Sequence, residues 1–422
     1  MTKGSFYNKI KLYTLELMAN ILGINLGEYS ATEVLEKSIE FLKDGGQHYI
    51  VTPNPEIILT SHQDEELFYI LNRADLSLAD GFGLKIAAWL FGEQIFRQTG
   101  ADLTKEILEI SSQKNIKTLI LNWKDGLSSA QDIKDSLNKQ YPTLDVLVID
   151  TNREGHLSKE VNEKINTFSP TILFNTFGCP YQEKNIYHGL KNWPSVKLAL
   201  AIGGSFDYIT GRAKRAPKVF RRLGLEWLWR LVRQPRRLKR IYNATCVFLT
   251  KVMVSRFINP HLYRPNVACM LYKKEEGINK ILVVERSDEI NHWQLPQGGL
   301  DGEGPEIAGA RELREETNVK NFISRGVFKN VSRYKFSNKA RNYHYEPKRQ
   351  DHENKKYKFD YKGQKQSLYI AEFTGQDDEI KINFWDHSAW KWVDEDKLVE
   401  IVHTVRQANA KIFLEKFKSL NL

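Results

Sequence analysis

Short apolar runs alternate with amphipathic stretches through the first half of the chain, from about Ile21 to about Ala201. The apolar runs end in Gly, Asn or Asp, and they read HYIVTPN, IKTLILN, LDVLVID, TILFNTFG and KLALAIGG. Stretches such as ATEVLEKSIEFLKDG and SSAQDIKDSLNKQY have the spacing of amphipathic helices. This alternation predicts a Rossmann-like α/β fold with a doubly wound parallel sheet, whose ligand site lies at the carboxyl ends of the strands.

The pattern changes after Pro260 and Pro265. NVACMLYKK, KILVVERS, SLYIAEF and AWKWV predict strands around a Glu-rich helix, and a closing helix is expected at about 396–418. These elements predict an α+β domain. The polar segment 338–366, rich in Lys and Arg, is expected to be a loop or an insertion. The predicted divisions are an N-terminal extension (1–17), an α/β domain (18–211), a basic segment (212–245), a linker (246–262) and the second domain (263–422).

Length and composition narrow the class of protein. A chain of 422 residues suits two or three domains. The three scattered cysteines predict a reducing cytoplasm and argue against a structural zinc site. Residues 1–18 carry charges throughout, unlike a signal peptide, and no stretch approaches about 18 uninterrupted apolar residues, so no membrane-spanning segment is expected. The net charge of +10 implies an anionic partner.

Most of that charge is concentrated between Arg212 and Arg240, where basic residues face a single acid, Glu226. Within it, Leu228, Leu231 and Val232 have the i, i+3, i+4 spacing of one helix face, and Trp and Arg lie alongside. This composition predicts an interfacial helix on anionic lipid. A helix packed on the core with a solvated basic rim is one alternative, and an RNA-binding surface is another.

Residues 294–317, QLPQGGLDGEGPEIAGARELREET, place three carboxylates on one helix face. Glu312, Glu315 and Glu316 are spaced i, i+3 and i+4, where like charges repel. A metal cation would convert the repulsion into coordination, and Mg²⁺ prefers such oxygen ligands. The alternative is a solvated helix face on which Arg311 pairs with Glu315.

Four blocks in this half resemble the Nudix hydrolases, within the branch of bacterial RNA pyrophosphohydrolases and dinucleoside polyphosphate hydrolases. They are YRPNV (263–267), WQLPQGGL (293–300), Glu303-x7-RELREET and GQKQ (363–366), and the resemblance covers about 263–418. It implies an α+β fold with a mixed sheet, and a pyrophosphate linkage as the substrate.

The Nudix resemblance also implies roles for particular residues. Glu312, Glu315 and Glu316 would hold Mg²⁺ or Mn²⁺, and Glu315 and Glu316 would take part in catalysis. Aligning WKWV (390–393) places Asp386 at a late acid that helps as base or ligand in relatives. Two departures are visible, because the loop from Gly298 to Glu303 is one residue short and Asn318 replaces a Gly; Asn tolerates the left-handed conformation at a helix end.

Five blocks in the first half resemble the WecG/TagA/CpsF glycosyltransferases, over about 18–243. They are TPNPE (52–56), LADGFG (78–83), TGADL (99–103), FGCPYQE (177–183) and GGSFDYITGRAKRAPKVFRRLGLEWLWRL (203–231). The resemblance implies transfer of an N-acetylmannosamine-type sugar from a UDP-sugar to a polyprenyl-diphosphate-linked acceptor sugar, without a metal in this domain.

Asp80 is the candidate base that deprotonates the acceptor hydroxyl, and the alternative is a turn-forming Asp-Gly pair with Gly81. The remaining candidates are expected to bind substrate. Thr52, Asn54 and Asp102 suit sugar hydroxyls, Gln182 and Glu183 suit the nucleotide side, and Arg215, Arg230, Arg233 and Arg237 suit the leaving diphosphate.

The sequence as a whole predicts a bifunctional cytoplasmic enzyme, peripheral on the inner face of the cell membrane. Its expected partners are a UDP-sugar, a polyprenyl-diphosphate-linked acceptor and anionic lipid, with a nucleotide or an RNA 5′ end for the second domain. Two other hypotheses remain open. One is an RNA 5′ pyrophosphohydrolase with a basic RNA-binding surface, and the other is a glycosyltransferase with a nucleotide-sensing Nudix module.

Overall fold

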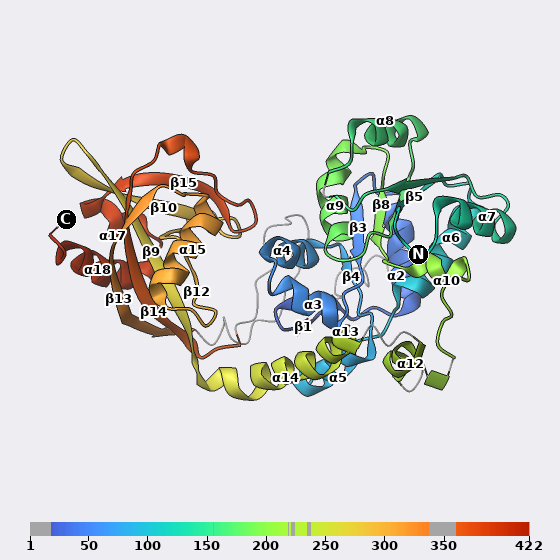
Figure 1. Ribbon diagram of the computed structural model, residues 1–422, viewed down its shortest axis with the longest axis horizontal. Helices are drawn as coiled ribbons and strands as arrows, with labels where there is room; N and C mark the ends of the chain where they lie inside the picture. The colour runs from blue at the N-terminus through green and yellow to red at the C-terminus, as the bar shows by residue number, and fades with distance from the viewer. Residues whose placement is uncertain are drawn as a thin grey trace, which may run out of the picture. The chain divides into compact units, whose positions relative to one another are not determined.

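The computed structural model describes residues 18–154, 156–217, 219–220, 224–233, 238–336 and 360–421, without the side chains of Arg230 and Arg233. The chain divides into two compact units, Met1–Met253 and Val254–Leu422 (Figure 1). The predicted extension 1–17, most of the segment 338–366 and the candidate Arg237 lie outside the described residues.

A six-stranded parallel sheet forms the centre of the first unit, in the order β4-β3-β8-β7-β5-β6. Its strands are β3 (His48–Val51), β4 (Leu76–Ser77), β5 (Thr118–Trp123), β6 (Val146–Thr151), β7 (Ile172–Asn175) and β8 (Leu198–Ala201). The predicted doubly wound parallel fold is therefore confirmed. Strand β4 was not predicted, because it has only two residues and so shows no periodicity.

Successive strand residues point to opposite faces of this sheet and so enter two separate cores. Leu119 and Leu121 pack in one core and Ile120 packs in the other. Helices cover both faces, as a parallel sheet requires. They are α2 (Ala31–Phe41), α3 (Pro55–Ser61), α4 (Glu65–Arg73), α5 (Phe82–Phe91), α6 (Gly100–Gln113), α7 (Ala130–Gln140), α8 (Lys159–Phe168), α9 (Tyr181–Gly189) and α10 (Ser205–Ile209).

An antiparallel hairpin of β1 (Met18–Ile21) and β2 (Ile24–Gly27) precedes the sheet. Its two-residue turn, Leu22-Gly23, has positive φ at both positions, 51° and 87°. Both values suit the turn that matches the twist of a hairpin, although Leu rarely occupies the first position. The usual Asn-Gly or Asp-Gly signal is therefore absent from the sequence, and the hairpin was not predicted.

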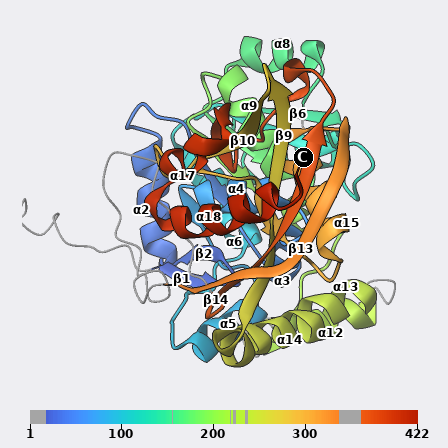
Figure 2. The same cartoon turned by 90° about the vertical axis from the view of Figure 1, so that its left-hand side faces the viewer.

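The end of the first unit is helical. After α12 (Glu226–Arg233), residues Leu238–His261 form a continuous helix that includes α13 (Leu238–Tyr242) and α14 (Phe248–Met253). Phe248 and Val252 are fully buried in the first unit's core, and α14 lies beside α5 (Figure 2). Among the described residues this is the one helix long and apolar enough to cross a membrane, and 17% of its most apolar stretch is buried. Residues 246–262 were predicted to be a linker, and this long apolar helix was not expected there.

The second unit is built on a mixed sheet in the order β11-β10-β9-β14-β13, with β12 paired to β9 and β15 paired to β10. The pair β9–β14 is parallel and the other pairs are antiparallel. The strands are β9 (Tyr263–Glu275), β10 (Ile278–Arg286), β11 (Trp293–Gln294), β12 (Gln297–Gly299), β13 (Phe322–Lys335), β14 (Gly363–Phe373) and β15 (His387–Asp394).

Helices flank this second sheet on its two faces. The Glu-rich helix α15 (Pro305–Thr317) belongs to one core, and α17 (Leu398–Ile401) and α18 (Thr404–Lys418) belong to the other. The predicted α+β fold with a mixed sheet is confirmed. Strand β13 was not predicted, because its burial pattern shows little regular alternation.

Candidate active sites

A cavity of about 750 Å³ lies at the carboxyl ends of the strands in the first unit. Residues at or directly after the strand ends line it, including Thr52 after β3, Asp80 after β4, Asn122 on β5 and Thr176 after β7. This is the position expected for the ligand site of a doubly wound sheet. Of the first unit's candidate residues whose side chains the structure describes, five line this cavity: Thr52, Asn54, Asp80, Gln182 and Arg215.

Asp80 is positioned by its own backbone and by the glycine that follows it. Its N–H donates to the carbonyl of Pro53 at 2.8 Å, which fixes the strand-end loop of β4 against that of β3. Gly81 has φ +136°, a value that L side chains rarely adopt, and it begins helix α5. The turn-forming Asp-Gly pair and the cavity position therefore coexist, and the turn presents Asp80 to the cavity.

Thr52 and Asn54 are partly used by the fold. The Thr52 hydroxyl donates to the carbonyl of Ala201 at 3.0 Å, so its oxygen remains as an acceptor for a ligand. The Asn54 side-chain oxygen caps α3 by accepting from the N–H groups of Glu56 and Ile57, at 2.9 and 3.0 Å. Its amide nitrogen is the part that can serve as a donor in the cavity.

Gln182 connects two strand-end loops. Its side-chain oxygen accepts from Gly178 N at 3.2 Å and from Gly203 N at 2.8 Å, and its nitrogen donates to Glu183 at 2.8 Å. Glu183 does not line the cavity and is 1% exposed. Burial raises the pKa of Glu183 to about 7, although the hydrogen bond from Gln182 opposes the shift. Gln182 therefore lines the cavity, and Glu183 holds it by a hydrogen bond from a buried position.

Asp102 forms an ion pair with Arg215. Both its oxygens accept from Arg215, at 2.6 Å each, and Thr99 accepts from Arg215 at 2.9 Å. The hydrogen bond to Asp102 is the main reason that the pKa of Arg215 is raised. Asp102 does not line the cavity, whereas Arg215 does. Asp102 is thus placed to orient Arg215. It is not placed to contact a sugar hydroxyl directly, as had been expected.

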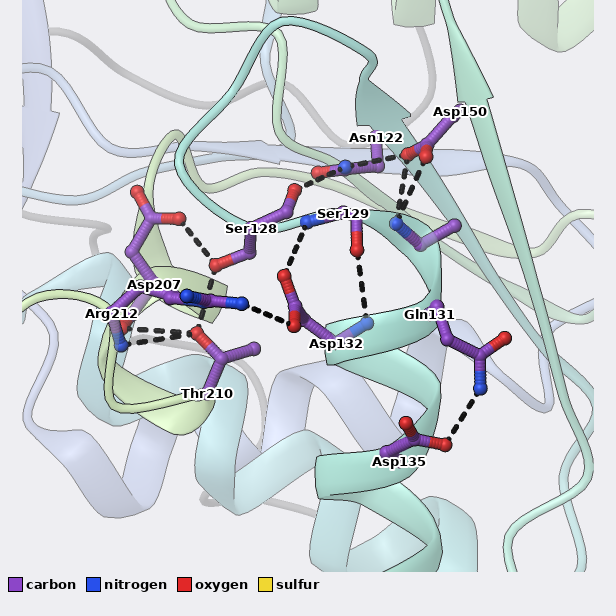
Figure 3. A network of polar contacts seen from close by, with 11 residues as sticks. Asn122, Ser128, Ser129, Gln131, Asp132, Asp135, Asp150, Asp207, Thr210 and Arg212 are labelled. Atoms are coloured by element: carbon purple, nitrogen blue, oxygen red, sulfur yellow. Dashed lines mark hydrogen bonds and ion pairs between the residues drawn. The ribbon is translucent and has the colours of Figure 1, made fainter.

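A polar network that was not predicted from the sequence contributes two residues to the lining of the cavity (Figure 3). Asn122 donates to Asp150 at 2.7 Å and to the carbonyl of Ser128 at 2.8 Å, and the Ser128 hydroxyl donates to Asp207 at 2.7 Å. Asn122 and Asp207 line the cavity. Asn122 ends one of the predicted strands, so its position at a strand's carboxyl end was the available signal. Asp207 lies in the quoted block GGSFDYITG and had no separate signal.

In the second unit, Arg311 gathers the carboxylates of the Glu-rich helix. It donates to Glu303 at 2.9 Å and to Glu312 and Glu315 at 2.8 Å each. Burial lowers the pKa of Arg311, but the hydrogen bond to Glu303 and the charges of Glu312 and Glu315 outweigh it and raise the pKa overall. The expected pairing of Arg311 with Glu315 occurs, and it is one contact in a larger cluster.

The two other helix carboxylates are buried. Glu312 is 4% exposed and Glu316 is 7% exposed, whereas Glu315 is exposed. A Cβ atom on Gly298 would lie 2.0 Å from the Glu312 carboxylate, so only glycine allows this loop to approach the helix. Glu316 accepts from the N–H of Gln297 at 3.0 Å.

Asp386 lies on the loop before β15, beside this cluster. Burial, followed by the negative charge of Glu316, raises the pKa of Asp386 to about 6. Its neighbour His387 lies 3.2 Å from Glu316. Asn318, the replacement for the usual glycine, ends α15 with φ 57° in the left-handed region, as expected. The shortened Gly298–Glu303 loop still allows Glu303 to reach Arg311.

The Nudix resemblance implies a divalent cation at this cluster, and the residues fit one. Glu312, Glu315 and Glu316 offer carboxylate oxygens, the donors that hard divalent cations prefer. Two of the three are buried, and burial of unneutralised carboxylates is costly unless positive charge compensates them. Arg311 supplies one positive charge to Glu312 and Glu315, and a cation would supply the rest.

Comparison with known proteins assigns each unit. The family model "Glycosyl transferase WecG/TagA/CpsF family" matches residues 19–261, and the NUDIX domain model matches residues 262–416. A Bacillus subtilis protein named N-acetylglucosaminyldiphosphoundecaprenol N-acetyl-beta-D-mannosaminyltransferase is 29% identical over 56% of this chain and 90% of its own. A protein of the same name from Bacillus spizizenii is 31% identical over 46% of this chain and 75% of its own.

Two of the solved structures that resemble part of this chain are as follows. A Caenorhabditis elegans Ap4A hydrolase binary complex is 18% identical, covers 37% of this chain and 99% of its own, and has a TM-score of 0.27. The NUDIX domain of Shewanella oneidensis NrtR, complexed with ADP ribose, is 18% identical. It covers 37% of this chain and 89% of its own, and has a TM-score of 0.25. From the family models, the chain belongs to the WecG/TagA/CpsF family of glycosyl transferases and continues into a segment that the NUDIX domain model matches.

Proposed function

We propose that the first unit transfers an N-acetylmannosamine-type sugar from a UDP-sugar to a polyprenyl-diphosphate-linked acceptor sugar, in cell-surface polysaccharide biosynthesis. The observation that carries this proposal is the cavity at the strand ends, which Asp80 and Arg215 line together with other polar residues. The names of the Bacillus relatives supply the substrate class.

In the proposed reaction, a carboxylate of Asp80 accepts the proton of the acceptor hydroxyl as that oxygen attacks the donor sugar. Arg215, fixed by Asp102, stabilises the charge of the departing diphosphate. Asn54 and Thr52 offer a donor and an acceptor to sugar hydroxyls. Arg230, Arg233 and Arg237 are proposed to reach the same diphosphate from the basic segment.

Asp80→Asn tests this assignment, because it keeps the size of the side chain and removes the base. Sugar transfer should fall by about 10²–10⁴-fold, the usual contribution of a general base, while donor affinity stays within a few-fold. Asp135→Asn is the matched control, since Asp135 is exposed on α7 and outside the cavity. Transfer by Asp80→Asn at the wild-type rate would reject Asp80 as the base.

For the second unit, we propose Mg²⁺- or Mn²⁺-dependent hydrolysis of a nucleoside diphosphate-linked substrate, so that the chain is bifunctional. Glu312, Glu315 and Glu316 would hold the cation, and Asp386 would assist as base or ligand. The cation, when bound, neutralises phosphate charge and activates water. Arg311 holds the helix carboxylates in place, and Gly298 lets its loop close over them.

Glu315→Gln, assayed in the full chain against dinucleoside polyphosphates, UDP-linked compounds and 5′-triphosphate RNA, tests this second activity. We expect hydrolysis only with Mg²⁺ or Mn²⁺, and a loss of several orders of magnitude in the variant. Exclusive cleavage of the RNA end would favour the RNA 5′ pyrophosphohydrolase hypothesis. Metal-dependent nucleotide binding without turnover would favour the sensing module.

We also propose that the enzyme is peripheral on the cytoplasmic face of the membrane. Apolar side chains of α13 and of the helix that follows it are exposed, among them Leu238 and Tyr242 at 60% and 57%. Lys239 and Arg240 lie between them, and basic and apolar residues in this combination favour an anionic lipid surface.

A further inference from the structure

Arg153 follows strand β6 and stacks on the last residue of the neighbouring strand β5. Its guanidinium carbon lies 3.2 Å from the centre of the Trp123 ring and 6.0 Å from the centre of the Tyr181 ring. A guanidinium held over aromatic rings is attracted to them and loses conformational freedom before any ligand arrives. Arg153 and Trp123 both line the cavity.

The donor groups of Arg153 have no protein partner among the described residues. Its Nε is buried without a hydrogen-bond acceptor, and no carboxylate pairs with the guanidinium. One terminal nitrogen lies 4.0 Å from where a Cβ of Gly178 would be, and Gly178 also lines the cavity. An unpaired buried donor of a charged group is costly, so this arrangement indicates an acceptor that is supplied by a ligand.

The other arginines that line the cavity are already bound to acids. Arg215 is bound to Asp102, Arg212 to Asp132, and Arg240 to Glu56 by two hydrogen bonds of 2.7 and 2.8 Å. Lys214 also lines the cavity but is exposed. Among the described arginines that line the cavity, Arg153 is therefore the one whose donors remain available for a ligand.

A second positive charge acts on Arg153. Burial is the main cause that lowers the pKa of Arg153, and the charge of Arg240 lowers it further. Two guanidinium groups within electrostatic range repel each other unless an anion lies between them. The planar fork of arginine binds phosphate by paired hydrogen bonds, so a diphosphate would satisfy the donors of Arg153 and offset the repulsion from Arg240.

We propose that Arg153, held against Trp123, is an anion clamp that binds a diphosphate in the cavity. The proposal rests on the proposed sugar transfer for the source of that diphosphate, which is either the UDP donor or the polyprenyl-diphosphate acceptor. Arg153 lies outside the basic segment to which the sequence analysis assigned diphosphate binding. Arg153 therefore adds a cavity-lining arginine that follows strand β6, whereas Arg215 belongs to the basic segment.

The test compares the full chain with its variants Arg153→Gln and Arg153→Lys, by calorimetric titration in a buffer with a chelator and no divalent cation. The probes are UDP, uridine, inorganic diphosphate and a short-chain polyprenyl-diphosphate N-acetylglucosamine. Arg73→Gln is the matched control, because Arg73 also stacks on a ring, that of Tyr69 at 5.0 Å, but lies outside the cavity.

Arg153→Gln should weaken UDP binding by about 10- to 100-fold, the worth of one or two charge-assisted hydrogen bonds, and leave uridine binding unchanged. Arg153→Lys, which keeps the charge but not the fork, should weaken it less, whereas Arg73→Gln should not weaken it. Loss of affinity for the lipid-linked acceptor instead of UDP would support the clamp and assign it to the acceptor.

Unchanged affinity of Arg153→Gln for every probe would overturn the clamp, and so would an equal loss for UDP and uridine. These outcomes are distinct from failure of the proposed function. If the wild type binds inorganic diphosphate through Arg153 but does not bind UDP, the clamp stands and the proposed donor is wrong. If the wild type binds UDP independently of Arg153, the donor stands and the clamp is wrong. If it binds none of the probes, both are wrong.

Discussion

Replacing Glu183 by glutamine removes a buried acid while keeping an oxygen that can accept from Gln182. Glu183 is 1% exposed, and burial raises the pKa of its carboxyl from 4.5 to about 7. The folded protein therefore holds this proton at pH values where the unfolded chain has lost it. A raised carboxyl pKa gives a stability contribution that is complete below about pH 4.5 and lost progressively as pH rises to about 7.

The size of the effect follows from the shift. Raising a pKa from 4.5 to about 7 is worth about 3 kcal/mol at about 1.4 kcal/mol for each pKa unit. Glu183→Gln cannot ionise, so it escapes this cost at high pH. The measured quantity is the free energy of unfolding of the variant minus that of the wild type. We expect this difference to be about 2 kcal/mol larger at pH 8 than at pH 5.

Hydrogen exchange with mass spectrometry measures this within the intact chain, because peptides from β7 and α9 report the opening free energy of the first unit. Comparing variant and wild type at each pH cancels the intrinsic exchange rate. Glu36→Gln, an exposed acid on α2, is the control and should change stability by less than about 0.5 kcal/mol at either pH. A Glu183→Gln difference that is the same at pH 5 and pH 8 would refute the buried-proton explanation.

Two further predictions concern the second unit and the exposed helix. Gly298→Ala should reduce Nudix hydrolysis by more than about 10-fold in a nucleotide assay, because the new Cβ would meet the Glu312 carboxylate at 2.0 Å. Gly304→Ala is the control, because Gly304 has φ −71° and open space around it, and equal activity of the two variants would contradict the prediction. The double variant Leu238→Ser, Tyr242→Ser should bind anionic vesicles more weakly in sedimentation, and binding by the wild type should weaken as salt rises. Ile290→Ser, 74% exposed in the second unit, is the control, and unchanged binding by the double variant would exclude this helix as the lipid contact.

The sheet of the first unit could be predicted because each long strand is a continuous apolar run that ends in a turn residue. Burial on both faces produces that pattern, and β5 and β7 follow it. β4 could not be found in this way, because a two-residue strand has no period. Strand β13 was not predicted for a different reason. Much of it is exposed or half-buried, so its position depends on its pairing with β14 and not on an apolar pattern.

Strand-end position predicted where the cavity lies, but not how each side chain is used there. Asp80 and Arg215 line the cavity as expected. Asp102 and Glu183 do not, because one is engaged by Arg215 and the other is buried beneath Gln182. The ion pair of Asp102 with Arg215 joins residues more than a hundred positions apart, and local spacing carries no information on it. The stacking of Arg153 on Trp123 joins residues at the ends of two different strands, so local spacing does not show it either.

The most direct test of the account is transfer itself. The purified full chain is incubated with a panel of UDP-sugars and a short-chain polyprenyl-diphosphate N-acetylglucosamine. The mass of the lipid product is then measured by mass spectrometry. We predict that the acceptor gains one N-acetylhexosamine residue from an N-acetylmannosamine-type donor, without added metal, and that Asp80→Asn forms this product at least about 100-fold more slowly. An acceptor of unchanged mass with every UDP-sugar would contradict the proposed sugar transfer.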